Sequence, residues 1–183
     1  MATPHPTLSV FASDHGPGDA ERASIMSQAG SYLARRGARI ACLGEDDGLP
    51  VPLVTAARSA GGEVVVVADQ DFATPPALHD LPLERYDGPE ARLARMAAIC
   101  DVMVGLPGSL ASATSLYRSW TKSQDKPVVL LNRNRAFESF RGFAADVFSH
   151  SIKRHDRKMQ FADSVEDMWN KIAWLLNEAG KAH

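Results

Sequence analysis

The chain has 183 residues, of which 45% are hydrophobic and 23% charged, and its formal net charge at pH 7 is −2. This length and composition are those of an ordinary globular protein, and we expect residues 1–183 to form one domain. The small net charge gives no electrostatic basis for binding nucleic acid or an anionic membrane. Met1–Pro6 lacks the basic flank and apolar core of a signal peptide, and no apolar run reaches membrane-spanning length. These features favour a cytoplasmic protein.

Short β-branched runs alternate with helical patterns along the whole chain, as in βαβ units. In chain order, the predicted strands are Leu8–Ala12, Arg39–Leu43, Glu63–Ala68, Leu83–Tyr86, Val102–Leu106, Pro127–Leu131 and Met159–Ala162. The predicted helices are about Ala20–Arg36, Pro50–Ala60, Asp87–Ile99, Ala111–Ser123 and Phe137–Phe148, with a last helix capped by Asp163 and Ser164. This order predicts an α/β fold, a three-layer Rossmann-like doubly wound parallel sheet with helices on both faces.

The predicted helix Ala111–Ser123 carries two kinds of side chain on neighbouring faces. Its apolar residues recur at i, i+3, i+4 and i+7, which predicts a buried stripe of Ala113, Leu116, Tyr117 and Trp120. Its small hydroxyls, on a flanking face, are Ser112, Ser115 and Ser119. Such hydroxyls either hydrogen-bond a phosphate or ribose or simply let helices pack closely, and the sequence leaves both roles open.

The strongest candidate site is the loop that joins Val102–Leu106 to the helix after it. Ligands of doubly wound sheets bind in the loops at the carboxyl ends of the strands. Gly108 allows close backbone approach, Ser109 is a natural helix cap, and the amides at a helix N-terminus suit a phosphate. The predicted phosphate-binding residues are Leu106, Pro107, Gly108, Ser109, Leu110, Ala111, Ser112 and Ser115.

Two more loops at predicted strand ends are weaker candidates. Gly44–Gly48 holds three adjacent acids, which are metal ligands or, more commonly, partners of a helix start. Its glycines, Gly44 and Gly48, are candidate ligand contacts. In the turn after the first strand, Ser13 and Asp14 either contact the ligand or are simply solvated. The histidines show no metal-ligand spacing and no cofactor motif is present, so we expect neither a metal nor a cofactor.

Several residues recur at the spacing of a known family. Arg92, Met96, Asp101 and Pro107 match R-K-x-x-M, then A-D, then P-G-G-x-G-T-x-x-E, without a gap, and Asp125–Pro127 matches a later D-K-P. This set resembles the Lonely Guy family, phosphoribohydrolases that activate cytokinins and whose bacterial relatives have often been mislabelled as lysine decarboxylases. The resemblance follows the whole chain in order. It implies a Rossmann-like fold, a homodimer, and a nucleoside-monophosphate site at the predicted phosphate-binding loop.

The chain departs from the family pattern at the residues nearest the chemistry. Ser109 and Ala111 stand where the second and third glycines are expected, and Ser112 replaces the threonine. Ser115 stands where the family has the glutamate of its catalytic pair, whereas Arg92 matches the arginine of that pair. The resemblance thus implies that Arg92 is the remaining catalytic residue if the protein is active.

Three functions are compatible with this pattern. The favoured one is binding of a nucleoside monophosphate, or a similar phosphate-bearing ligand, with weak or no hydrolase activity. The second is an active phosphoribohydrolase that cleaves the N-glycosidic bond of AMP or of cytokinin riboside 5′-monophosphates. Breaking that bond develops positive charge on the ribose, which a serine hydroxyl stabilises far less than a carboxylate. The third, a molybdenum-cofactor carrier, rests on resemblance to carriers of the same fold. The expected partners are a nucleotide-like small molecule and a second copy of the chain.

Overall fold

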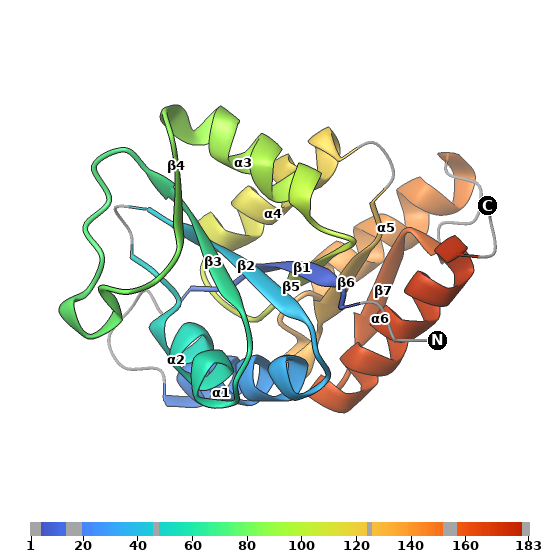
Figure 1. Ribbon diagram of the computed structural model, residues 1–183. Coiled ribbons are helices and arrows are strands. Elements are labelled where there is room, and N and C mark those ends of the chain that lie inside the picture. The colour runs from blue at the N-terminus through green and yellow to red at the C-terminus, as the bar shows by residue number, and fades with distance from the viewer. Residues whose placement is uncertain (1–4, 14–19, 46–47, 124–125, 152–156, 181–183) are drawn as a thin grey trace.

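One seven-stranded sheet forms the centre of the molecule (Figure 1). The computed structural model describes residues 5–13, 20–45, 48–123, 126–151 and 157–180. The strand order is β4-β3-β2-β1-β5-β6-β7, and all six neighbouring pairs are parallel. The strands are β1 Thr7–Phe11, β2 Arg39–Gly44, β3 Val64–Asp69, β4 Leu83–Tyr86, β5 Val102–Gly105, β6 Val128–Leu131 and β7 Met159–Ala162. The predicted α/β fold is confirmed.

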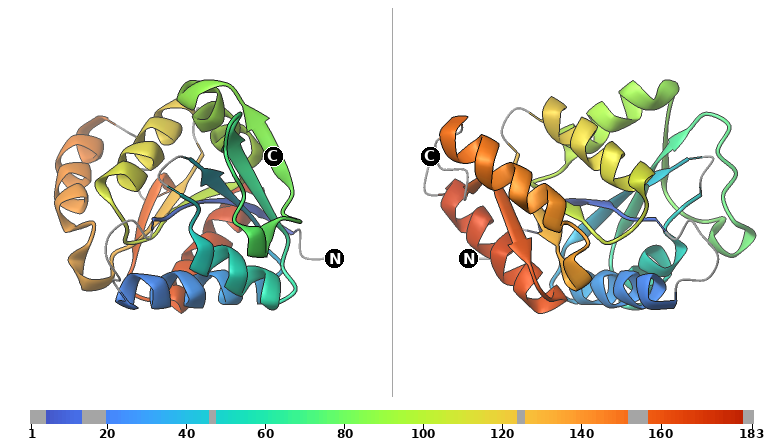
Figure 2. Two further views of the ribbon diagram at one scale, coloured as in Figure 1. Left: turned by 90° about the vertical axis from the view of Figure 1, so that its left-hand side faces the viewer. Right: turned by 180° about the vertical axis from the view of Figure 1, so that it is seen from behind.

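Helices cover both faces of the sheet (Figures 1 and 2). On one face lie α1 (Ala20–Arg35), α2 (Val51–Ser59) and α6 (Val165–Gly180), and on the other lie α3 (Gly88–Ile99), α4 (Leu110–Lys122) and α5 (Glu138–Ser151). Single 3-10 turns at Pro76–Leu78 and Arg133–Arg135 complete the elements. The sheet is therefore doubly wound, as predicted.

A hydrophobic core lies on each side of the sheet. The strand β3 is buried on both faces through Val64–Ala68, which explains why its sequence is continuously apolar rather than alternating. Cys42 and Cys100 are buried free thiols. Burial raises the pKa of the Cys42 thiol to about 12, because the thiolate would be formed away from water.

The predicted buried stripe of α4 is confirmed only at Leu116, which is 6% exposed. Ala113 and Trp120 are half-buried, and Tyr117 is 45% exposed. Ser119 is buried instead, and its hydroxyl donates a 2.8 Å hydrogen bond to the carbonyl of Leu93 on α3. The small serine lets α3 and α4 approach closely, so α4 turns Leu116 and Ser119 inward. Tyr117 then faces α5, where its ring meets that of Phe140 edge-on at 6.2 Å.

The direction of winding reverses between β1 and β5. From β1 the chain adds β2, β3 and β4 on one side, and from β5 it adds β6 and β7 on the other. The helices that follow β1 and β5 therefore lie on opposite faces of the sheet, and in doubly wound folds such a reversal opens a crevice at the carboxyl ends of the two strands. The backbone amide of Leu106 donates a 3.0 Å hydrogen bond to the carbonyl of Phe11, which fixes the two strand ends together. The predicted phosphate-binding loop starts at this point.

Candidate functional site

The loop after β5 packs tightly against the end of β1. Leu106 and Pro107 are buried, which anchors the start of the loop. A Cβ atom on Gly108 would lie 2.7 Å from Ser112 Oγ and 3.0 Å from the backbone nitrogen of Ser13. Glycine is therefore required here by close packing, whether or not a ligand also approaches.

The helix α4 begins with a reciprocal capping box. The Oγ of Ser109 accepts a 3.1 Å hydrogen bond from the Ser112 amide, and the Oγ of Ser112 accepts a 3.1 Å bond from the Ser109 amide. Two of the four amides expected to hold a phosphate are thus already paired. The other two, on Leu110 and Ala111, have no acceptor among the described residues. These two amides and the helix dipole remain to attract an anion.

A small polar cavity of about 40 Å³ lies in the crevice. It is enclosed by the carboxyl ends of β1 and β2 and by the first turns of α4. The polar residues that line it are Ser13, Glu45, Ser109, Ser112 and Ser115, with Gly48 and Ala111 beside them. A space of this size holds one group about as large as a water molecule. The structure thus brings together the serines that the sequence singled out, apart from Ser119.

A larger cavity of about 640 Å³ lies on the other side of the same loop, between α4 and α5. Its wall near the sheet is the loop Leu106–Ser109. Much of the rest is aromatic and consists of Tyr117, Trp120, Phe137, Phe140 and Phe143. Cavities that bind small molecules usually measure about 300–1,000 Å³. This cavity therefore has the size and the apolar lining of a ligand site.

Arg22 is a site residue that the sequence analysis missed. It lies in the first turn of α1 and lines the larger cavity together with Gly108 and Ser109. Its position in the sequence could have indicated this role, because the helix that follows β1 starts next to the point where the winding of the sheet reverses. Arg22 places a positive charge next to the predicted phosphate-binding loop.

Arg92, the residue that matches the arginine of the family's catalytic pair, lies outside both cavities. It is only 5% exposed and lines neither cavity. One terminal nitrogen of its guanidinium donates to the carboxylate of Asp69, at the end of β3. The other lies 3.6 Å from Oε1 of Glu45, just after β2. No sequence pattern indicates this grouping, since the three residues come from separate βα units.

The glycines of the acidic loop have different roles. A Cβ on Gly44 would lie 2.8 Å from Cγ1 of Val66 and 3.1 Å from the ring of Phe72, so Gly44 is a packing residue. Gly48 has φ +111°, a backbone conformation that favours glycine, and it lines the small cavity. Asp14 lies outside the described residues.

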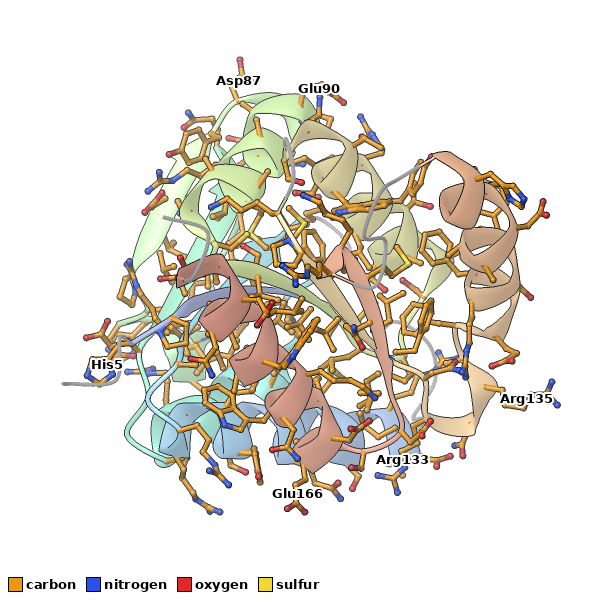
Figure 3. The ribbon with its side chains drawn as sticks, turned by 90° about the vertical axis from the view of Figure 1, so that its right-hand side faces the viewer. His5, Asp87, Glu90, Arg133, Arg135 and Glu166 are labelled. Atoms are coloured by element: carbon orange, nitrogen blue, oxygen red, sulfur yellow. The ribbon has the colours of Figure 1, made fainter. Side chains whose placement is uncertain are left out.

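Two exposed residues can be placed relative to the site. Leu110 is the first residue of α4, and its side chain is 83% exposed. Glu90 lies in the first turn of α3 (Figure 3). It pairs with Arg118 and, at 2.5 Å, with Lys122. Glu90 therefore does not supply the carboxylate that Ser115 lacks.

No helix in the described part of the chain has the length and hydrophobicity needed to cross a membrane. Among the same residues, no three His, Cys, Asp or Glu side chains gather as a metal site would require.

Solved structures resemble this one over nearly its whole length. TM1055 is 20% identical and has a TM-score of 0.69, covering 92% of this chain and 99% of its own. The molybdenum cofactor carrier protein of Chlamydomonas reinhardtii is 21% identical with a TM-score of 0.69 (95% and 99% covered). The molybdenum cofactor binding protein of Rippkaea orientalis is 17% identical with a TM-score of 0.68 (96% and 99% covered).

These likenesses establish the fold. The chain and its structural neighbours share a Rossmann-like architecture. No family model matches the chain, and no curated protein matches it significantly. The site must therefore be interpreted from its own geometry.

Proposed function

We propose that the protein binds a nucleoside monophosphate, or a similar phosphate-bearing ligand, at the loop Leu106–Ser112. One observation carries the proposal: the α4 N-terminus, with the unpaired amides of Leu110 and Ala111, lies at the crevice between β1 and β5. This is where ligands bind in doubly wound sheets, and helix N-termini attract anions. Arg22 adds a positive charge on the wall of the adjoining larger cavity.

The same geometry supports weak or absent hydrolase activity. Ser115 lines the small cavity with a neutral hydroxyl, where the family pattern has its catalytic glutamate. Arg92 is held by two carboxylates and lines neither cavity. Binding ground and transition states equally does not accelerate the chemical step, so a site that retains only the phosphate contacts binds without efficient turnover.

Calorimetric titration with AMP tests the binding proposal. We expect the parent protein to bind AMP and Arg22→Glu to bind it at least tenfold more weakly, because the variant replaces an attractive charge by a repulsive one. Arg35→Glu, at the far end of the same helix, is the matched control and should bind like the parent. Absence of binding heat at millimolar AMP would refute the proposal, and equal losses in both variants would refute the role of Arg22.

A second candidate is a carrier of molybdenum cofactor, whose pterin is larger than a nucleobase and also bears a phosphate. Two structural neighbours are described as molybdenum cofactor proteins, and the cavity of 640 Å³ next to the loop would accommodate a larger ring system. Native mass spectrometry of freshly purified protein distinguishes the candidates by the mass of a co-purified ligand. A nucleotide mass supports the first function and a pterin mass the second.

We also propose that the protein is a homodimer that uses the outer face of α4 and α5. Leu110, Tyr117 and Phe143 are 83%, 45% and 51% exposed and border the larger cavity. A second copy packed on these side chains would bury them and close the cavity, which is the usual use of an exposed apolar patch. Sedimentation equilibrium at micromolar concentration tests this, and a single species near 19.8 kDa would refute it.

A further inference from the structure

The apolar stripe of α4 faces the larger cavity. All four of its residues, Ala113, Leu116, Tyr117 and Trp120, line this space of about 640 Å³ between α4 and α5. Their spacing is that of a helix face that packs on a core, yet only Leu116 is fully buried. The wall on the side of α5 carries three further aromatic rings, those of Phe137, Phe140 and Phe143. Two apolar helix faces thus enclose a space that favours an apolar occupant.

The aromatic walls favour a flat ring in particular. The ring of Phe140 lies edge-on to that of Tyr117 at 6.2 Å, and it is tilted by 31° to that of Phe143 at 6.4 Å. Aromatic rings attract one another face to edge and offset at such distances. Trp120 is fixed in the wall, because its ring nitrogen donates a 3.1 Å hydrogen bond to the carbonyl of Lys126. A planar aromatic group can therefore pack against rings that are already in place.

One positive charge lies at this apolar cavity. Among the described residues that line it, Arg22 is the only charged one. Ser109, the N-cap of α4, lines the cavity as well, so the positive end of the helix dipole adds to the charge of Arg22. The amide of Asn134 donates a 2.6 Å hydrogen bond to Glu21, which ties the first turn of α1 to the segment before α5. The charge is thus held beside the aromatic walls, where it favours an anionic group.

We infer that this cavity binds a planar aromatic molecule that carries one anionic group, with the ring between α4 and α5 and the anion at Arg22. The inference goes beyond the proposed function, because such a ligand needs neither a ribose nor a phosphate. A nucleobase bearing a phosphate through its sugar and a free aromatic acid both offer this chemistry. The small cavity of about 40 Å³ has no room for a ring, whereas the larger one has.

Fluorescence titration of the full chain with two matched probes tests the charge. The probes are anilinonaphthalene sulfonate and its uncharged analogue phenylnaphthylamine, and we expect the parent to bind a single molecule of either. Arg22→Gln should weaken binding of the sulfonate by about tenfold, the effect of one hydrogen bond to a charged group, and leave the uncharged probe unaffected. Arg35→Gln, in the last turn of the same helix, is the control and should bind both probes like the parent. Unchanged binding of the sulfonate by Arg22→Gln would overturn the inference.

A substitution that fills the cavity tests the position of the ring. Ala113→Phe places a new ring in the space, so it should prevent binding of both probes, and thermal unfolding checks that the variant is folded. Thr114→Phe is the matched control, since Thr114 is the next residue of α4, is exposed and lines neither cavity. A probe held only by the exposed apolar side chains outside the cavity would bind Ala113→Phe as well as the parent, which would also overturn the inference.

Competition for the uncharged probe distinguishes the two sources of the ligand. Displacement by AMP shows that a nucleobase occupies the cavity, and displacement by naphthoate but not by AMP shows that a free aromatic acid does. Either result supports the inference. If the parent binds AMP but neither probe, the inference fails and the proposed function stands. If it binds both probes as expected but not AMP, the proposed function fails and the inference stands.

Discussion

Replacing Gly108 by alanine is expected to disturb the first turn of α4, although Gly108 itself precedes the helix. The new Cβ would lie 2.7 Å from Ser112 Oγ, closer than such atoms approach, and 3.0 Å from the backbone nitrogen of Ser13. The Ser112 hydroxyl is the part that moves most easily. Its rotation breaks the bond from the Ser109 amide at 3.1 Å and the bond from its own hydroxyl to the Ser109 carbonyl at 2.9 Å.

The expected magnitude follows from these two bonds. Each contributes about 1 kcal/mol, so Gly108→Ala should lower the free energy of unfolding by roughly 1–2 kcal/mol. For a chain of this length the melting temperature should fall by about 2–8 °C. AMP affinity should fall as well, because the displaced turn carries the amides of Leu110 and Ala111.

Gly142→Ala is the matched control for this substitution. Gly142 lies inside α5, and a Cβ there would have no atom within 4 Å. Alanine at this position should therefore stabilise the protein by about 0.5–1 kcal/mol, since glycine is a poor helix former. Thermal unfolding and calorimetric titration measure both variants. A Gly108→Ala protein as stable as the parent, with unchanged AMP affinity, would show that the loop is not packed as described.

Three further predictions address other parts of the molecule. Above pH 9 the Cys42 thiol ionises only in the unfolded chain, so this one group should lower the free energy of unfolding by about 1.4 kcal/mol per pH unit up to about pH 12. Cys42→Ala should remove that part of the slope, as measured by denaturant titrations at several pH values. Tyr117→Asp should convert the proposed dimer to monomer in sedimentation equilibrium, because it places a charge on an apolar interface. The parent should release little or no adenine from AMP by chromatography, and Ser115→Glu should gain measurable release. Parent turnover near 1 per second would show that another carboxylate, Glu45 first, serves the reaction.

Much of the fold could be predicted from the sequence because a buried strand requires a run of apolar residues that is visible in the local sequence. Most of the strands are short apolar runs bounded by turn residues, and Val64–Ala68 is apolar throughout because helices cover both faces of β3. The rotation of a helix about its own axis is harder to predict from the sequence. The spacing of α4 fitted a stripe that included Tyr117, but the close contact of Ser119 with Leu93 on α3 decides which face turns inward. That contact joins residues 26 positions apart, and single-helix periodicity does not contain it.

The candidate site also has one part that could be predicted from the local sequence and one part that could not. The cap at Ser109 and the tight glycine at Gly108 are local features, and the sequence placed both. The partners of Arg92 depend on which strand ends lie beneath α3, and they join β2, β3 and α3 across 23 and 47 positions of the chain. The sequence therefore shows the acidic loop as a cluster of charge, but it does not show that Glu45 of this loop lines the small cavity.

The capping box gives a physical meaning to the departures from the Lonely Guy pattern. A glycine at position 109 has no side chain to pair with the Ser112 amide, so more amides at the helix start would remain free for a phosphate. Ser109 instead stabilises the helix by about 1 kcal/mol, and it does so by occupying a donor that a ligand would use. Ser112 occupies a second donor, the amide of Ser109. The free helix is thus more stable and its anion site is smaller, which suits a protein that binds and releases its ligand intact. In the proposed function, Arg22 and the two remaining amides then supply the affinity for the phosphate.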